Sequence, residues 1–143
     1  MLAVVSAFLS TAGEYLDRAD GEGFPTHLCG YSRANYGYVV RLMREMNGEM
    51  PPEAPMGGAA KPALLVSESY ICEARVKWFQ ALGRYMDVPV WMMETATPGV
   101  EEFFLEGAQE NAAKLIANEL REFIAYLEKL LGRQVAIQND ANC

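Results

Sequence analysis

The scarcest side chains of this chain that could take part in chemistry are its three cysteines and its single histidine. Cys29 lies in the stretch HLCGYSR, where a short apolar run meets the start of a predicted helix. Cys72 lies in an equivalent place, after the run LLVSESYI and at the start of the next predicted helix. A helix N-terminus lowers the pKa of a thiol and favours the thiolate, the form that attacks substrates and binds metals. Both cysteines are therefore candidates for nucleophilic or metal-binding chemistry.

Three interpretations of these cysteines stay open on the residues alone. Free cysteine is among the most buried residue types, and the lack of any CxxC pair favours cysteines that fill space in a core. A nucleophilic Cys29 would need a base, and His27, two residues away, would lie on the same face of a strand. A zinc site would need four nitrogen or sulfur ligands, and those that the chain offers are far apart in sequence.

Alternating strand and helix patterns indicate the elements that position these residues. Apolar runs predict strands at Thr26–Cys29, Ala63–Ser67 and Val88–Glu94. Helical spacing predicts one helix within residues 2–19 and another from Arg33 to about Met46, with Ser32 as its N-cap. It also predicts a helix over about residues 76–86 and a long helical region in two pieces, which ends at Gly132. We predict an α/β fold, a three-layer parallel sheet with flanking helices of the flavodoxin-like or Rossmann-like type. Because ligands gather beyond the carboxyl ends of parallel strands, Cys29 and Cys72 are expected to face one crevice.

Composition narrows the classes of function. The chain has 143 residues, of which 51% are hydrophobic, and its net charge of −7 makes nucleic acid an unfavourable partner. The apolar N-terminus has no basic region before it, and no stretch approaches the ~18 apolar residues of a membrane span. Three widely spaced cysteines do not form a disulfide framework. We therefore expect a cytoplasmic protein without a membrane anchor.

Three segments carry a resemblance to a known family. CGYSRANYGY, PALLVSESYICEARVKWFQALGRYMDVPVW and LREFIAYLEKLLGR resemble, in order and from about Gly13 to Arg133, the N-terminal part of the 2-hydroxyacyl-CoA dehydratase and benzoyl-CoA reductase family. The variants CGYSRA and KWFQALGRYMDVPVW look more like the ATP-dependent benzoyl-CoA reductases of anaerobic aromatic degradation. Members of this family are longer, so the resemblance implies an N-terminal domain over residues 1–133, half of a two-domain subunit, with residues 134–143 beginning its continuation.

The resemblance implies a subunit of an oxygen-sensitive iron–sulfur enzyme that uses single low-potential electrons. Such an enzyme is either an oxidoreductase that reduces the aromatic ring of a CoA thioester or a lyase that removes a 2-hydroxyl group. The implied cofactor is a [4Fe–4S] cluster with Cys29 and Cys72 as two of three cysteine ligands. The third ligand is expected outside this chain, because Cys143 comes too early, so this chain alone is expected to be inactive. The implied partners are a homologous cluster-bearing subunit, an ATP-hydrolysing iron–sulfur activator and a CoA-thioester substrate.

Residues near the two cysteines have a functional and a structural interpretation. Ser32 and Arg33 could hydrogen-bond cluster sulfurs or a substrate carbonyl, or could serve as a helix cap and an ion pair. Glu68 and Glu73 could donate protons, although a glutamate at a helix start more often complements the helix dipole. Further candidates to line a pocket follow the third predicted strand, namely Glu94, Thr95 and Thr97.

A different class of function also stays open. The long C-terminal helix carries a broad apolar stripe, which would suit a non-catalytic α/β module that associates with another subunit. Iron content separates the two classes, because a pure association module would be colourless.

Overall fold

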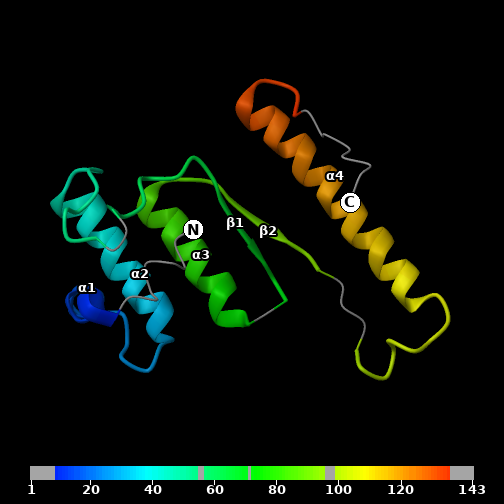
Figure 1. Cartoon of the computed structure of the whole chain (residues 1–143), viewed down its shortest axis with the longest axis horizontal. Helices are drawn as coiled ribbons and strands as arrows, with labels where there is room; N and C mark the ends of the chain where they lie inside the picture. Colours follow the sequence, from blue (N-terminus) through cyan, green and yellow to red (C-terminus); the bar gives the residue numbers. More distant parts are fainter. Residues whose placement is uncertain (1–8, 55–56, 71, 96–98, 136–143) are drawn as a thin grey trace. The chain divides into compact units, whose positions relative to one another are not determined.

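The computed structural model describes residues 9–54, 57–70, 72–95 and 99–135, with side chains from residue 13 onward. Its elements are α1 (Leu9–Gly21), α2 (Gly30–Val40), the π-helical segment η2 (Arg41–Glu45), β1 (Leu65–Glu68), α3 (Glu73–Met86), β2 (Val90–Met93) and α4 (Ala108–Leu131) (Figure 1). The chain divides into two compact units, residues 1–92 and residues 93–143. The first unit contains both candidate cysteines that the structure describes.

The sheet has two parallel strands in the described part of the chain, β1 and β2, which α3 connects. The Leu65 amide donates to the Pro89 carbonyl over 3.0 Å. Along β1, Leu65 and Ser67 are buried and Val66 is exposed, the alternation of a strand covered on one face. The second and third predicted strands are thus confirmed, each shorter than its apolar run because pairing stops where the neighbouring strand ends.

The first predicted strand, Thr26–Cys29, was wrong. Residues 26–28 form a turn, in which the Leu28 amide donates to the Pro25 carbonyl over 3.0 Å, and Cys29 is the N-cap of α2. A short apolar run satisfies its backbone groups either in a ladder or in local turns. No described strand lies beside residues 26–29, and these residues form a turn instead. The predicted three-layer sheet is therefore not seen in the described residues.

Helix α2 begins earlier than predicted and ends as predicted. It starts at Gly30, and Ser32 lies in its first turn, so the prediction of Ser32 as N-cap was also wrong. Its last turn widens into the π-helical η2. At Asn47 and Gly48 the backbone takes positive φ values of 50° and 90°, and the Gly48 amide donates back to the Leu42 carbonyl over 2.7 Å. This left-handed exit is the helix stop that the Asn-Gly pair predicted.

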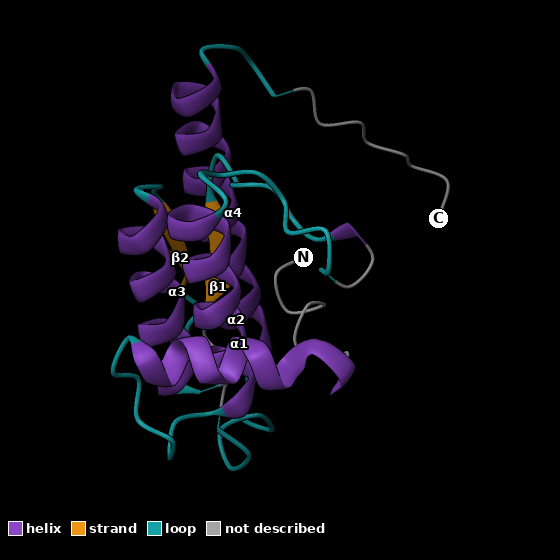
Figure 2. Cartoon of the chain, turned by 90° about the vertical axis from the view of Figure 1, so that its left-hand side faces the viewer, coloured by secondary structure: helices purple, strands orange, loops and turns teal. Residues whose placement is uncertain are grey.

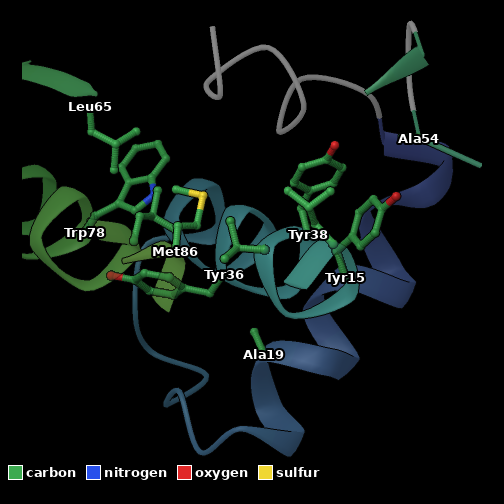
Figure 3. Packing of buried hydrophobic residues seen from close by; sticks show 11 residues of the cluster. Tyr15, Ala19, Tyr36, Tyr38, Ala54, Leu65, Trp78 and Met86 are labelled. Carbon is green, nitrogen blue, oxygen red and sulfur yellow. The ribbon is translucent and has the colours of Figure 1, made fainter. Parts of the chain in front are cut away.

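The core of the first unit lies between α1, α2 and α3 (Figure 3). Helix α1 lies across α2 (Figure 2), and the two backbones approach so closely that a Cβ at Gly37 would come 1.7 Å from the Tyr15 carbonyl oxygen. Tyr38 donates its buried hydroxyl to the Ala59 carbonyl over 2.7 Å and accepts the Ala59 amide over 2.8 Å. Phe79, predicted as core, is partly buried and packs against this cluster.

The second unit is dominated by α4, a single helix of 24 residues. The first of the two predicted helical pieces is a series of turns over residues 100–107, and only the second piece is helical. Gly132 ends α4 with a φ of 64°, as predicted. No residue of α4 is buried, and its leucines at positions 115, 120, 130 and 131 are exposed. Within the described residues, no helix is both long and apolar enough to cross a membrane.

Candidate metal centre

Both candidate cysteines occupy the same position relative to a helix. Cys29 is the N-cap of α2 and Cys72 is the N-cap of α3, and both carry free, exposed thiols. Neither side chain caps its helix through a hydrogen bond. The interpretation that they fill space in a core is therefore wrong.

The two helix starts border one cleft. Helices α2 and α3 begin at the same end of the first unit, which is also the end where β1 leads into α3 (Figure 1). A cleft of 560 Å³ between them is lined by Leu28 and Ser32 beside Cys29, and by Glu73 and Ala74 beside Cys72. Neither cysteine is among the residues that line this cleft, so the expectation that both thiols face one crevice stays a prediction.

Tyr36 belongs to this site, although its sequence pattern indicated packing alone. It is buried, its ring stacks on Phe24 with centroids 4.0 Å apart, and it lines the cleft. The pKa of Tyr36 is raised to about 12, mainly by burial and to a lesser degree by the electrostatic effect of the nearby Cys29 and Tyr85. The phenol is therefore protonated at neutral pH and can act as a hydrogen-bond donor. Its spacing could have revealed it, because seven residues after Cys29 a helix returns to nearly the same face.

Ser32 and Arg33 hold the Cys29 turn in place. The buried Ser32 hydroxyl donates to the Cys29 carbonyl over 2.8 Å, so it orients the backbone of the candidate ligand. The Arg33 guanidinium pairs with Asp20 and also donates to the Thr26 carbonyl over 3.5 Å. For Arg33 the structure therefore shows the ion pair, one of its two predicted roles.

The acidic candidates of the first unit and His27 lie in different surroundings. Glu68 pairs with Arg75, so the end of β1 is tied to the first turn of α3 across Cys72. Glu73 is exposed and lines the cleft. His27 is exposed, and no hydrogen bond within the described part of the chain orients it toward Cys29. A thiol nucleophile with His27 as base thus receives no support from the geometry.

The remaining candidates lie outside the first unit. Glu94 and Thr95 belong to the second unit, and Thr97 and Cys143 lie outside the described residues. In the described residues, no group of three or more histidine, cysteine, aspartate or glutamate side chains could hold a metal. The two exposed thiols therefore do not form a complete metal site within the described residues.

Comparison with known proteins gives a consistent match over nearly the whole chain. The family model described as 2-hydroxyglutaryl-CoA dehydratase, D-component, matches residues 2–139. The alpha subunit of lactoyl-CoA dehydratase from Anaerotignum propionicum is 27% identical over 85% of this chain and 29% of its own length. The alpha subunit of (R)-2-hydroxyisocaproyl-CoA dehydratase from Clostridioides difficile is 25% identical over 85% of this chain and 26% of its own length. The chain thus spans less than a third of the length of these relatives.

Proposed function

The chain belongs to the 2-hydroxyglutaryl-CoA dehydratase D-component family, and from this premise we propose that it forms the N-terminal part of a 2-hydroxyacyl-CoA dehydratase subunit, in which Cys29 and Cys72 bind one iron–sulfur cluster. The observation that carries the proposal is the pair of exposed thiols at the N-caps of α2 and α3, two helices whose first turns line one cleft. When bound, a [4Fe–4S] cluster supplies one-electron chemistry at low potential. Its third cysteine ligand would come from a part of the protein beyond this chain.

The chain's own residues would position and tune these ligands. The Ser32 hydrogen bond fixes the Cys29 backbone, and the Glu68–Arg75 ion pair restrains the loop that carries Cys72. Tyr36 keeps its proton beside Cys29 and can donate a hydrogen bond to a sulfur or to a substrate oxygen. Groups of this kind set the orientation of metal ligands and the potential of a cluster.

The proposed reaction is that of a lyase, the removal of water from a 2-hydroxyacyl-CoA thioester. The names of both relatives support a dehydratase rather than reduction of an aromatic CoA thioester, the reaction that the KWFQALGRYM segment suggested. Because both relatives are named as alpha subunits, we propose a hetero-oligomer with a homologous cluster-bearing subunit. An ATP-hydrolysing iron–sulfur activator and a cytoplasmic location complete the proposal. In the complete protein, strands from outside this chain would extend the β1–β2 sheet into a three-layer arrangement.

Iron content tests the ligand assignment. We expect the complete protein, produced without oxygen with its partner subunit, to contain about four irons per cluster and to absorb visible light. Cys29→Ser and Cys72→Ser should each remove the iron and the absorption while the far-ultraviolet circular dichroism stays unchanged. Cys143→Ser is the matched control and should keep both. Full iron content and normal turnover of a 2-hydroxyacyl-CoA in Cys29→Ser would refute the assignment.

A second candidate function has one observation in its favour. The 24 residues of α4 include none that is buried, and the exposed fractions of Leu115 and Leu120 are 55% and 43%. A non-catalytic module that associates with another subunit would present such a face. In that case the complete protein would be colourless, and Leu120→Asp would weaken subunit association without any change in metal content.

A further inference from the structure

The segment between α1 and α2, which carries Cys29, has one aromatic anchor. Most of residues 21–30 are exposed, and only Glu22, Phe24 and Leu28 among them are partly buried. Phe24 packs against the core cluster of the first unit and also lines the cleft between α2 and α3. Its side chain therefore ties an otherwise exposed segment to the interior.

Backbone hydrogen bonds at the end of α1 fix where Phe24 lies. The Phe24 amide donates to the Ala19 carbonyl over 3.0 Å, and the Gly23 amide donates to the Asp20 carbonyl over 2.9 Å. Gly23 has a positive φ of 86°, so the two bonds form a Schellman motif, a common way for a helix to end. The direction in which Phe24 leaves α1 is thus set by the backbone.

The Phe24 ring bridges the two helices that begin at the candidate ligands. It stacks on Tyr36 of α2, with ring centroids 4.0 Å apart, and its centroid lies 5.9 Å from that of Tyr85 of α3. Both separations are those of aromatic rings in contact. Cys29 is the N-cap of α2 and Cys72 is the N-cap of α3. One side chain therefore acts as a spacer between the two helices that carry these cysteines.

A polar contact holds the same segment against α3. The Tyr85 hydroxyl donates to one carboxylate oxygen of Glu22 over 3.2 Å, and Arg44 of η2 pairs with the other oxygen. The Arg44 guanidinium also lies over the Tyr85 ring, 5.5 Å from its centroid. Burial, and then the Glu22 carboxylate, raise the pKa of Tyr85, so its phenol stays protonated and able to donate. The segment is thus held to α3 at both Glu22 and Phe24.

We propose that Phe24 is a positioning residue, which holds α2 and α3 at the separation that lets Cys29 and Cys72 bind one cluster. This inference rests on the proposed function, because it concerns the placement of its two ligands. Both thiols are exposed and neither caps its helix through a hydrogen bond, so their relative position depends on how the two helices are spaced. Groups that orient metal ligands without touching the metal change metal affinity by about 10–100-fold when they are mutated.

Cross-linking of the two thiols tests the spacing without any metal. Dibromobimane becomes fluorescent once both of its arms have reacted with thiols, so it reports thiols that lie close together. We would treat the complete protein with a chelator, add dibromobimane and quantify the Cys29–Cys72 cross-link by mass spectrometry of its peptides. Phe24→Ala should lower the yield of this cross-link severalfold, and Phe24→Tyr, which keeps the ring, should retain the wild-type yield. An unchanged yield in Phe24→Ala, or no such cross-link in the unmodified protein, would overturn the proposal.

Leu42→Ala separates positioning from a general loss of stability. Leu42 lies in η2, has an exposed fraction of 1% and is not among the residues that line the cleft. Its truncation leaves a cavity in the core, and the cross-link yield should stay at the wild-type value. Where Phe24→Ala fails to fold, Phe24→Leu takes its place, because leucine keeps an apolar side chain without a stacking face. Equal losses of yield in Leu42→Ala and the Phe24 variant would show a purely structural role and overturn the proposal.

Iron affinity keeps this inference apart from the proposed function. In competition with a chelator, Phe24→Ala should bind iron roughly tenfold or more weakly than the unmodified protein, and Phe24→Tyr should bind it equally well. If Cys29→Ser keeps its iron while Phe24→Ala loses the cross-link, the proposed function fails, although Phe24 still sets the spacing of the thiols. If Cys29→Ser loses its iron while Phe24→Ala keeps both the cross-link and the wild-type iron affinity, the function stands and the positioning role of Phe24 is refuted.

Discussion

The two units of this chain bury their apolar residues to very different extents. In the first unit, large side chains such as Tyr15, Tyr38, Leu82 and Met86 are fully buried, and three helices and a strand contribute to one core. In the second unit, the sequence of α4 also places apolar residues along one face of the helix, but none of its residues is buried. An amphipathic pattern therefore shows that a helix has a face to cover, and it does not show what covers it. The first unit is held by contacts among its own elements, whereas no residue of α4 is described as buried.

The largest expected effect comes from the crossing of α1 and α2. Gly37→Ala would place a Cβ 1.7 Å from the Tyr15 carbonyl oxygen, and that atom is backbone, so α1 as a whole must shift. We expect a loss of about 4 kcal/mol or more in the free energy of unfolding, measured by denaturant titration with circular dichroism.

Gly13→Ala is the matched control for this crossing. Gly13 lies within α1 with no atom within 4 Å of the added Cβ, and alanine favours the helix, so the change should be neutral or stabilising by up to ~1 kcal/mol. Similar losses in both variants would mean that the crossing is not as close as described.

A leucine pair tests the comparison of the two units directly. Leu82→Ala in α3 removes a side chain with an exposed fraction of 0% and should cost about 2–5 kcal/mol through the cavity that it leaves. Leu120→Ala in α4 removes one that is 43% exposed, and should cost less than about 1 kcal/mol in this chain. Equal costs would show that the apolar face of α4 is already covered, and the comparison would fail.

Two tyrosines of the first core should respond differently to loss of the hydroxyl group. Tyr38→Phe leaves the buried amide and carbonyl of Ala59 without the partner that each has now, and should cost about 1–3 kcal/mol. The buried Tyr15 hydroxyl has no hydrogen-bond partner among the described residues, so Tyr15→Phe should be neutral or slightly stabilising. Thermal unfolding of the two variants measures the difference, and a larger loss for Tyr15→Phe would contradict it.

The smallest expected effect is a dependence of stability on pH. Hydrogen bonds from Arg18 and Arg41 lower the pKa of Glu45, and a hydrogen bond from Arg41 lowers the pKa of Glu53, from the ordinary value of 4.5. A carboxyl group whose pKa is lower in the folded state binds protons more readily once unfolded. Its stabilisation is therefore complete above about pH 4.5 and is lost as the pH falls through the lowered pKa.

Thermal midpoints between pH 7 and pH 3 measure this dependence. Arg41→Gln should flatten the fall in midpoint at acid pH, because the folded-state pKa of both glutamates returns toward the ordinary value. The α4 pair of Lys114 and Glu110 is 66% and 70% exposed, so solvent screens it, and Lys114→Gln should leave the profile unchanged. An identical profile in Arg41→Gln and the unmodified chain would show that the ion pairs of Arg41 with the two glutamates add nothing to stability.

Local signals in the sequence predicted several features correctly. The apolar runs located β1 and β2, the Asn47-Gly48 pair and Gly132 located two helix ends, and Cys72 was placed at the start of α3. The family was identified from its motifs, and the match over residues 2–139 confirms it. These features depend on residues close together in the chain, or on a pattern shared by a family. The third cluster ligand and the cluster itself stay predictions.

Other features were settled only by contacts between distant residues. Whether Thr26–Cys29 became a strand depended on a neighbouring strand, which the sequence does not specify, and a turn formed instead. Tyr36 reached the candidate site because α2 and α3 pack side by side with their starts at one end, and the same packing placed Phe24 against both helices. By itself, the sequence determined where most of the helices and the two strands form, because backbone hydrogen bonding and local periodicity are properties of neighbouring residues. Only the tertiary structure decided which side chains face one cleft and which apolar faces are covered, because packing joins residues that the chain keeps far apart.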